Sequence, residues 1–518
     1  YCLDAEGIKP EDLDLVVQTA NFEIPDRLFF HGERLFKFPD KPEIVNISHH
    51  LAHAYSAIGT CPFDKCYVMV IDGCGSPFSQ YQILHPELPG TMMGDFKSAQ
   101  EMICEKDSFY YFDGKHLHTL QKDFSPMSAL NSNQNLSLPT TRHSIGGFYA
   151  AVSHYVFGNM DDVGKLMGLA PFGRTGIYDQ EAFIFNKGRL FMKDNWSEHL
   201  TRPSYGYEYF NQNFEYYANI AKWAQEQVEK AVLYCIGDRL KDRSVANLCY
   251  TGGVALNAVA NARLLDQLEG TEVYFEPAAG DNGLALGCAY YGWLHYLGKK
   301  RVEHEGSTCF GRKYNEAYVE RAVHGHKSEK QYTVIDFQDE PEMLKVCAQK
   351  LCEGKVIGWF QDGSEFGPRA LGRRSILAHP GIEGLQDHIN RNIKFREDFR
   401  PFAPAVQEEN VAAYFEKGRH SPYMILVDRT RPEYSEQLKN VTHKDGSARV
   451  QTVNRKWNPR FWLLIEEFGK QSGIPVLLNT SLNKKGMPMV ETPEEALSFF
   501  EGTDLDLLIM GRKMLLKK

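Results

Sequence analysis

Two histidines and two aspartates have the residue types and the spacing to bind one metal ion. His49 and His53 lie four residues apart after a short apolar segment, so in a helix both rings project from one face. Asp72 and Asp281 each stand in a glycine-containing turn. Two His and two Asp suit Fe(II), Mn or Zn with positions left for a substrate oxygen. Taken alone, the histidines are as often ordinary helix residues, and each aspartate more often bonds local amides.

Glycine turns allow a second kind of chemistry, the close approach of backbone to a nucleotide. Gly252 and Gly253 follow a predicted strand, and amides at the start of the next helix could bind phosphate or ribose. Lys165 is flanked by Gly164 and Gly168, but the residue after Lys165 is Leu, which excludes the phosphate-loop pattern of NTPases. A Gly-Gly pair is a weak signal, and a lysine by itself is more often solvated.

A run of cations in the last third of the chain predicts polyphosphate binding. The glycine-bounded segment 367–375 contains three arginines, and Lys394, Arg396 and Arg400 follow it. Arginine offers forked donors that match phosphate, and lysine adds a compact charge. A solvated basic face is the commoner origin of such a run. Against that alternative, Arg400 lies in the apolar, proline-rich segment 399–404.

Strands and helices must position these residues, and the apolar patterning predicts both. Strands are expected at 13–17, 44–47, 66–71, 245–250, 272–275, 356–360, 475–478 and 505–510, and helices at 219–241 and 257–268. Because one strand ends at Asp72 and another ends shortly before Asp281, the sequence predicts two facing half-sites. Asn479 and Ser481 follow a strand and are expected at a ligand rim. Residues 105–142 lack apolar periodicity and are expected to form an irregular insertion.

The composition is that of a globular protein with more than one domain. The chain has 518 residues, of which 43% are apolar and 24% charged, and domains usually have about 100–200 residues. The apolar stretches have strand length, so neither a membrane span nor a signal peptide is expected. The domain boundary is expected within the charged, histidine-rich stretch 298–342.

The net charge of -9 lies in the N-terminal part of the chain. Residues 331–518 contain 27 Lys/Arg and 26 Asp/Glu, whereas residues 1–330 contain 31 and 41. An acidic surface disfavours nucleic-acid binding. The 11 cysteines include no CxxC pair, so neither a disulfide framework nor a Cys-ligated zinc is expected, and a reducing cytoplasm fits best.

Eight segments together resemble the ATP-dependent O-carbamoyltransferases of nodulation-factor, antibiotic and toxin biosynthesis. The resemblance covers almost the whole chain in the family's order and rests on SHHLAHAYSA (48–57), VIDGCGS (70–76), GKLMGLAPFG (164–173), TGGVALN (251–257), GDNG (280–283), FGPRALGRRS (366–375), HINRNIKFREDFRPFAP (388–404) and LLNTSLN (477–483). GPRALG and RPFAP are the most specific of these motifs. The resemblance implies a place in bacterial secondary metabolism.

The fold implied by this resemblance is α/β with two domains. An actin-like ATPase domain, which is a duplicated RNase H-like fold, would occupy residues 1–325. A YrdC-like domain would occupy residues 335–518. Family members begin with a further β-hairpin that carries an early histidine near the acceptor, and this chain is expected to start after it. The general base at the acceptor hydroxyl is therefore left unassigned.

The resemblance also implies a two-step reaction and a role for each matched residue. The YrdC-like domain would convert carbamoyl phosphate and ATP, accompanied by Mg²⁺, to carbamoyl adenylate, and the actin-like domain would pass the carbamoyl group to a hydroxyl. The ligands of the transfer-site metal, with iron expected, would be His49, His53, Asp72 and Asp281. The contacts to carbamoyl adenylate would be Gly146, Lys165, Gly253 and Asn257. The site for ATP and carbamoyl phosphate would comprise Arg369, Lys394, Arg400, Arg449, Asn479 and Ser481, with Lys394 and Arg400 taking part in catalysis.

Other functions stay open from the sequence alone. Related enzymes carbamoylate tRNA or a hydrogenase-maturation protein, but the acidic N-terminal part disfavours tRNA and no cysteine-rich zinc module is found. A non-catalytic actin-like nucleotide-binding module would not need the cationic site.

The acceptor is expected to be a small hydroxylated molecule, and the acidic N-terminal part favours a cationic one. Saxitoxin-type guanidinium alcohols, aminoglycosides and macrolactams all fit this description. The Lys- and Asn-containing composition favours a cyanobacterial toxin enzyme. No membrane or nucleic-acid partner is expected, and an oligomer is compatible with the resemblance.

Overall fold

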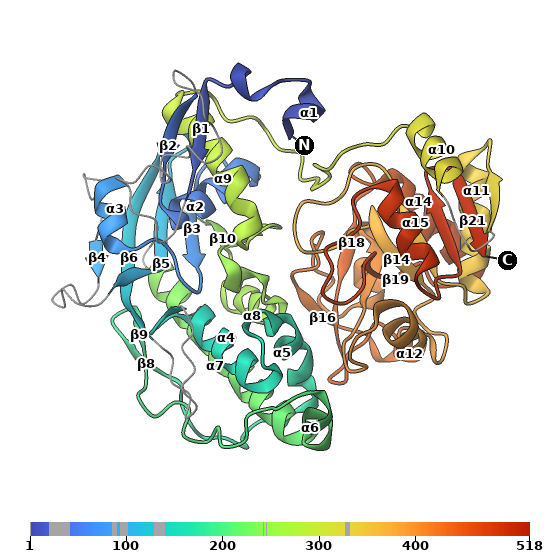
Figure 1. The fold of residues 1–518 in the computed structure, drawn as a ribbon. Helices are drawn as coiled ribbons and strands as arrows, with labels where there is room; N and C mark the ends of the chain where they lie inside the picture. The colour runs from blue at the N-terminus through green and yellow to red at the C-terminus, as the bar shows by residue number, and fades with distance from the viewer. Residues whose placement is uncertain are drawn as a thin grey trace. The chain divides into compact units, whose positions relative to one another are not determined.

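The computed structural model describes most of the chain as two compact units. The described residues are 2–19, 42–84, 91–93, 102–128, 140–241, 243–244, 246–326 and 332–517. Unit 1 comprises residues 1–306 and unit 2 residues 307–518, and each has its own sheet and helices (Figure 1). Both units are mixed α/β, which confirms the expected fold class. Among the described helices, none is both long and apolar enough to span a bilayer.

Within the described residues, unit 1 is built on a seven-stranded sheet with the order β11-β10-β3-β5-β6-β4, and β7 pairs with β6. The strands are β3 (Cys66–Ile71), β4 (Thr91–Met93), β5 (Ile103–Phe112), β6 (Leu117–Ser128), β7 (Thr140–Thr141), β10 (Asn247–Thr251) and β11 (Glu272–Phe275). β3, β5 and β6 form an antiparallel meander, whereas β10 and β11 run parallel to β3. Three antiparallel strands followed by two parallel strands make the RNase H-like sheet expected of an actin-like domain.

The helices of unit 1 pack against this sheet or against one another, apart from the first helix, in which no residue is buried. They include α1 (Cys2–Glu6), α2 (His49–Thr60), α3 (Phe78–Leu84), α4 (Ile145–Phe157), α5 (Val163–Leu169), α6 (Tyr207–Gln212), α7 (Phe214–Leu240), α8 (Ala258–Gln267) and α9 (Leu284–Tyr290). α2 lies beside α9 and packs on β3, β5 and β10 (Figure 1). A Cβ on Gly59 would overlap the Tyr290 ring, and one on Gly287 would overlap the Ala52 carbonyl. Glycine at these two positions therefore lets α2 and α9 approach closely.

The expected irregular insertion at 105–142 is wrong over its described residues before 129. β5 and β6 are the longest strands of the sheet, and each of them is paired on both sides. Residues 129–139 lie outside the described chain. The apolar alternation is absent because Glu105, Lys106 and Asp107 interrupt β5, and all three are buried.

Charges inside the sheet are neutralised by partners from distant segments. Lys106 lies 2.6 Å from Asp123, and Arg189 lies 2.7 Å from the other oxygen of the same carboxylate. Arg239 on α7 lies 3.1 Å from Asp107. Although burial would raise the pKa of Asp123, Lys106 and Arg189 hold it below its usual value. Buried charges persist only when they are paired and hydrogen-bonded, so these residues belong to the core and not to a loop.

Unit 2 contains an eight-stranded sheet in the described residues, with the order β12-β21-β20-β13-β14-β19-β15-β18. The strands are β12 (Tyr332–Asp336), β13 (Ile357–Phe360), β14 (Arg374–Ala378), β15 (Ala403–Gln407), β18 (Gln451–Val453), β19 (Val476–Ser481), β20 (Leu507–Met510) and β21 (Lys513–Lys517), and β16 (Val427–Arg429) pairs with β17 (Ser447–Arg449) apart from them. The expected strands at 356–360, 475–478 and 505–510 are thereby confirmed as β13, β19 and β20.

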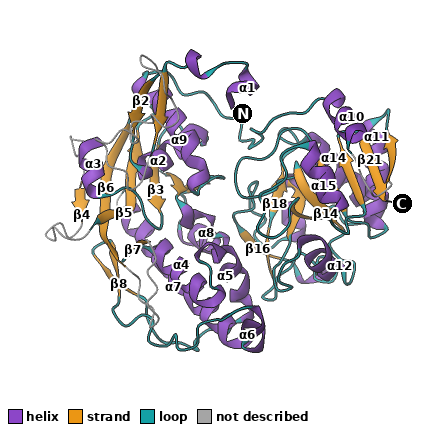
Figure 2. Cartoon of the chain, in the orientation of Figure 1, coloured by secondary structure: helices purple, strands orange, loops and turns teal. Residues whose placement is uncertain are grey.

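The core of unit 2 lies between this sheet and its helices (Figure 2). The helices are α10 (Glu316–Gly325), α11 (Glu340–Cys352), α12 (Leu385–His388), α13 (Val411–Tyr414), α14 (Pro459–Ser472) and α15 (Pro493–Glu501). Asn458 caps the start of α14, where its side chain accepts a hydrogen bond from the Phe461 amide. Gly473, in the left-handed conformation, caps the end of the helix. Asparagine and glycine are the residues that these two capping positions favour, so the local sequence determines where α14 starts and ends.

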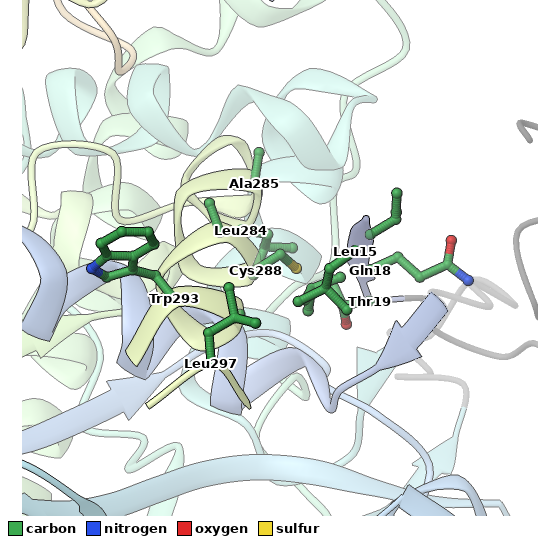
Figure 3. Close-up of a pocket in the computed structure, with 12 residues that line it drawn as sticks. Leu15, Gln18, Thr19, Leu284, Ala285, Cys288, Trp293 and Leu297 are labelled. Carbon is green, nitrogen blue, oxygen red and sulfur yellow. The ribbon is translucent and has the colours of Figure 1, made fainter. Parts of the chain in front are cut away.

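An apolar pocket of about 650 Å³ opens beside the short parallel pair β1 (Leu15–Gln18) and β2 (Glu43–Asn46). Figure 3 shows Leu15 from β1 on one side of it, and Leu284, Cys288 and Leu297 on the other. The residues that follow Thr19 lie outside the described chain. The lining is mostly apolar and contains few polar side chains that could take part in a reaction.

Replacement of Asp123 by Asn should destabilise unit 1 by about 3–5 kcal/mol, because Lys106 and Arg189 would keep their charges without a carboxylate. Urea denaturation followed by circular dichroism measures this change. Asp194→Asn is the matched control, since Asp194 also pairs with an arginine but is 89% exposed, and it should leave the unfolding midpoint unchanged. Equal midpoints for Asp123→Asn and the wild type would contradict the structural role of this network.

Candidate functional site

Four side chains predicted as metal ligands converge in unit 1. His49 and His53 come from α2, Asp72 follows β3, and Asp281 starts a short 3₁₀ turn before α9. Nε2 of His49 lies 3.1 Å from Oδ2 of Asp72 and 3.4 Å from Oδ1 of Asp281. Nε2 of His53 lies 3.6 and 3.7 Å from the same two oxygens. The two Nε2 atoms are 3.2 Å apart, so all four groups face one point.

Helix α2 begins where it does because distant groups bond its first amides. Ser48 precedes the helix, but its side chain makes no capping hydrogen bond. Instead, the His49 amide donates to Oγ of Ser76 at 2.9 Å, and the His50 amide donates to Oε2 of Glu105 at 3.3 Å. The first amides of a helix have no partner within the helix. These tertiary acceptors therefore hold the first turn of α2, and with it both predicted histidine ligands.

The Asp72 turn packs tightly against two glycine-containing segments. A Cβ on Gly146, in the first turn of α4, would lie 2.7 Å from the Gly73 nitrogen. Gly252 has a φ of +90°, and a Cβ there would overlap the β3 backbone. The Gly253 amide donates to Oδ1 of Asp72 at 3.3 Å. The structure thus brings Gly146 and Gly253 beside the Asp72 turn.

The two carboxylates of the cluster are stabilised only with positive charge close to them. Burial alone would raise the pKa of Asp72, but hydrogen bonds from His49 and His53 hold it well below its usual value. Burial would also lower the pKa of His49, yet hydrogen bonds to Asp281 and Asp72 raise it to about 10. Protons on imidazole here supply the positive charge that balances two carboxylates. A divalent cation would supply that charge in their place.

The donor set fits a divalent transition metal. Two imidazole nitrogens and two carboxylate oxygens within 4.8 Å of one another suit Fe(II), Mn or Zn. Within the described residues, Nδ1 of His53 is buried without a hydrogen-bond partner. Burial raises the pKa of the nearby Glu276 carboxyl to about 7, an effect that the charge of His53 opposes. A histidine that faces a metal through Nε2 keeps its proton on Nδ1, where an outer carboxylate can orient the ring. The Asp281 side chain is 73% exposed, so the cluster opens to solvent on that side.

A buried ion pair supports the cluster from the sheet. Glu105 on β5 pairs with Lys122 on β6, and neither side chain is more than 1% exposed. The carboxylate also accepts from the amides of Ser76 at 3.0 Å and His50 at 3.3 Å. Burial would raise the pKa of Glu105, but Lys122 lowers it to about 2. One carboxylate thus ties the start of α2 and the turn after β3 to the sheet.

Two other predicted contacts in unit 1 have structural partners. Asn257 caps α8 by accepting from the Ala260 amide at 3.1 Å, and it exchanges two hydrogen bonds of 3.0 Å with Gln225. Lys165 on α5 pairs with Asp162 at 2.6 Å and is only 9% exposed. Lys165 is therefore not the solvated lysine that its residue type alone favours.

Five cations gather in unit 2. They are the buried Lys394 and the half-buried Arg369, Arg396, Arg400 and Arg449. Burial and the charge of Arg400 lower the pKa of Arg369 to about 10. Burial also lowers the pKa of Arg449 well below its usual value, and the charges of the other arginines add to this. Like charges held together away from water are costly unless an anion joins them, so this group is not a solvated basic face.

Lys394 ends a π-helix, Ile389–Lys394, and contacts the rim that follows β19. Its Nζ donates to the Ser481 carbonyl at 2.6 Å, to Oγ of Ser481 at 3.0 Å and to Oδ1 of Asn483 at 2.6 Å. Burial, followed by the charges of two neighbouring arginines, holds the pKa of Lys394 well below its usual value. Asn479 lies two residues earlier on β19. The structure therefore brings Lys394 and Ser481 together, with Asn479 on the same strand.

The arginines of segment 367–375 differ in their surroundings. Arg374 is fully buried, stacks on the Phe360 ring at 3.7 Å and donates to backbone carbonyls. Arg373 forms an ion pair with Asp362. Arg374 and Arg373 therefore have structural partners, whereas burial and the charge of Arg400 lower the pKa of Arg369.

Sequence patterning missed three residues that shape these sites. Glu105 and Lys122 lie in the segment expected to be irregular, and the one signal for them was a charged triplet inside a segment of strand length. Arg396 was noted in the cationic run but was not assigned to the site. Burial and the charge of Arg400 lower the pKa of Arg396 well below its usual value, which identifies it as a member of the group.

Comparison with known proteins gives one consistent result for both units. The family model "Carbamoyltransferase N-terminus" matches residues 3–290, and "Carbamoyltransferase C-terminus" matches residues 348–517. An uncharacterized protein of Synechocystis sp. is 31% identical over 93% of this chain and 77% of its own length. Nodulation protein NolO of Bradyrhizobium diazoefficiens is 31% identical over 91% of this chain and 79% of its own. The 3'-hydroxymethylcephem-O-carbamoyltransferase of Amycolatopsis lactamdurans is 29% identical over 92% of this chain and 81% of its own length.

Replacement of Glu105 by Gln should destabilise unit 1 by about 3–5 kcal/mol, because Lys122 would stay buried and charged without its partner. Adding Lys122→Met should recover most of that loss, since the double variant buries no charge and Gln can still accept from the Ser76 amide. Guanidinium denaturation of the two variants and the wild type measures the difference. A double variant as unstable as Glu105→Gln alone would refute the ion-pair argument.

Proposed function

The chain belongs to the carbamoyltransferase family, and from that membership we propose that it is an ATP-dependent O-carbamoyltransferase. Unit 2 forms carbamoyl adenylate from carbamoyl phosphate and ATP, and unit 1 transfers the carbamoyl group to a hydroxyl of a small acceptor. The observation that carries this proposal is the group of five cations in unit 2, whose pKa values are lowered by burial and by the charges of their neighbours. Glu397 lies 3.9 Å from Arg400 but also pairs with Lys485, and a ligand with several negative charges would relieve the repulsion that remains.

The unit 2 reaction brings several anionic groups together. Carbamoyl phosphate, water and ATP balance to carbamoyl adenylate, phosphate and pyrophosphate. Arg369, Arg400 and Arg449 would bind phosphate oxygens through their forked donors. Lys394 would place a compact charge beside the oxygens that become more negative as the pyrophosphate leaves. The Ser481 contacts hold its ammonium group in position before the ligand arrives.

The unit 1 cluster supports the transfer step. His49, His53, Asp72 and Asp281 would hold the divalent metal, with Fe(II) proposed and Mn or Zn as alternatives. When bound, such an ion acts as a Lewis acid toward the carbamoyl carbonyl. The Gly253 amide beside Asp72 and the first turn of α4 at Gly146 offer backbone donors for the adenylate phosphate.

The acceptor is proposed to be a small molecule with a hydroxyl group. One relative is named for carbamoylation of a hydroxymethyl group on a cephem, and another is a nodulation protein. The N-terminal residues 1–330 carry 10 more acidic than basic side chains. Such a surface would attract a cationic acceptor more strongly than an anionic one.

Lys394→Ala should slow carbamoyl-phosphate-dependent ATP–pyrophosphate exchange by about 100-fold or more, because one preorganised cation is lost from the site. Lys470→Ala is the matched control: Lys470 lies in the same unit but is 57% exposed and pairs with Glu466 and Glu467, so exchange should be unchanged. Exchange at the wild-type rate in Lys394→Ala would show that the cationic group is not the adenylation site.

The double variant His49→Ala/His53→Ala should purify without the divalent metal and lose carbamoyl transfer. It should keep pyrophosphate exchange, because that step is assigned to unit 2. Elemental analysis measures metal per chain, and His324→Ala, which removes a histidine that is 71% exposed, should retain it. Full metal occupancy in the double variant would disprove the assignment of these ligands.

A further inference from the structure

Three cysteines bring their sulfur atoms together in the core of unit 1. Cys61 follows the end of α2, Cys66 begins β3, and Cys249 lies on β10. Their Sγ atoms all lie within 4.8 Å of one another, and those of Cys66 and Cys249 are 3.5 Å apart. All three residues are at most 3% exposed. Cys66 and Cys249 are 183 residues apart in the sequence, so no local spacing motif reveals the group.

This convergence differs from the ordinary burial of a cysteine. Cys347, for example, is also fully buried, but it lies in the apolar core of unit 2. A free cysteine normally behaves as a small hydrophobic residue and packs against carbon. In the three-cysteine group, each sulfur instead has two other sulfurs as neighbours.

A cation also faces the group. The Arg301 guanidinium lies 3.4 Å from Sγ of Cys61, and the Arg301 side chain is only 15% exposed. Hydrogen bonds from the Cys249 and Cys66 thiols, with a further contribution from Arg301, lower the pKa of Cys61. Negative charge is therefore favoured on the Cys61 sulfur, as the thiolate that binds metals. Burial and the neighbouring thiols raise the pKa of Cys249, and the pKa of Cys66 is raised by the Cys61 thiol and by burial, so metal binding would have to displace those two protons.

We propose that Cys61, Cys66 and Cys249 form a binding site for a thiophilic monovalent cation, Cu(I). Thiolates select Cu(I), Zn and iron–sulfur clusters over harder ions. Structural zinc sites and iron–sulfur clusters take four protein ligands, and no fourth His, Cys, Asp or Glu atom joins this group within the described residues. Three sulfurs around one ion at about 2.3 Å would be about 4 Å apart. The observed separations, 3.5 Å for Cys66 and Cys249 and at most 4.8 Å for the other pairs, lie on either side of that value, so only small shifts are required.

Each thiol that becomes a ligand gives its proton to water as the sulfur–copper bond forms, so three bound sulfurs release three protons. One Cu(I) and three thiolates together carry a charge of -2, and the Arg301 guanidinium, 3.4 Å from Sγ of Cys61, reduces the local charge to -1. The group lies close to the surface in sequence, since Cys61 and Cys66 flank the segment 62–65, in which Pro62, Asp64 and Lys65 are exposed.

The site would join three elements that carry the His-Asp cluster. α2 starts with His49 and ends beside Cys61, β3 runs from Cys66 toward Asp72, and β10 runs from Cys249 toward Gly253. The 12 residues of α2 separate the two sites by about 18 Å. Copper bound to the cysteines would therefore stabilise the packing of α2, β3 and β10 and would not contact the reacting groups.

The test is an anaerobic titration of the reduced, full-length chain with Cu(I) buffered by a competing chelator, followed by X-ray absorption at the copper edge. We expect one tightly held Cu(I) per chain with three sulfur neighbours. His49→Ala/His53→Ala should bind it equally, which separates this site from the metal of the proposed function. A nitrogen-containing shell, no uptake, or tighter three-sulfur binding of Zn²⁺ in a parallel titration would overturn the assignment.

Cysteine-to-serine variants identify which sulfur atoms bind the copper ion. Cys249→Ser should lose the stoichiometric site, whereas Cys235→Ser, which removes a buried cysteine of α7 outside the group, should keep it. Equal uptake by Cys249→Ser and the wild type would overturn the proposal. If Cys249→Ser does not fold, the number of sulfur neighbours of copper in the wild-type protein tests the proposal instead, because that measurement needs no variant.

Discussion

The buried ion pair of Glu105 with Lys122 is the contact on which the geometry of the His-Asp cluster depends. A charge in the interior of a sheet is stable only with a partner, and here the partner leaves the carboxylate free to accept two backbone amides. Those amides belong to the start of α2 and to the turn that follows β3. Because α2 has no side-chain cap of its own, the direction of His49 is determined by the sheet beneath it.

Unit 2 shows the opposite electrostatic arrangement. In the sheet of unit 1 each buried charge has a counter-charge within the fold, whereas Lys394 and the arginines near it lower one another's pKa. Such repulsion costs stability, which Glu397 at 3.9 Å from Arg400 offsets only in part, and the arrangement fits the proposed anion site. Arg374, fully buried and stacked on Phe360, shows that this unit can also bury an arginine for structure alone.

The sequence predicted what depends on local pattern and missed what depends on distant pairing. β3, β10 and β11 were found because their apolar runs end at turns, and the four predicted ligands of unit 1 were singled out because they stand near such ends; the structure brings these four side chains together. β5 and β6 were missed because Lys106 and Asp123, which look like surface residues in sequence, neutralise each other in the core. Arg369 and Arg374 are indistinguishable by composition, since burial and neighbours alone separate their roles. The three cysteines escaped notice for the same reason.

Helix α2 unites these constraints. Its first turn is bonded by Ser76 and Glu105, its last turn approaches α9 so closely that only glycine fits at Gly59, and the residue after it, Cys61, lies beside β3 and β10. A helix held at both ends cannot rotate about its axis without breaking contacts at each of them. The separation of the His49 and His53 rings from the two aspartates is therefore a property of the packed scaffold. It follows that the site is organised before any ligand binds, so little binding energy is spent on ordering it.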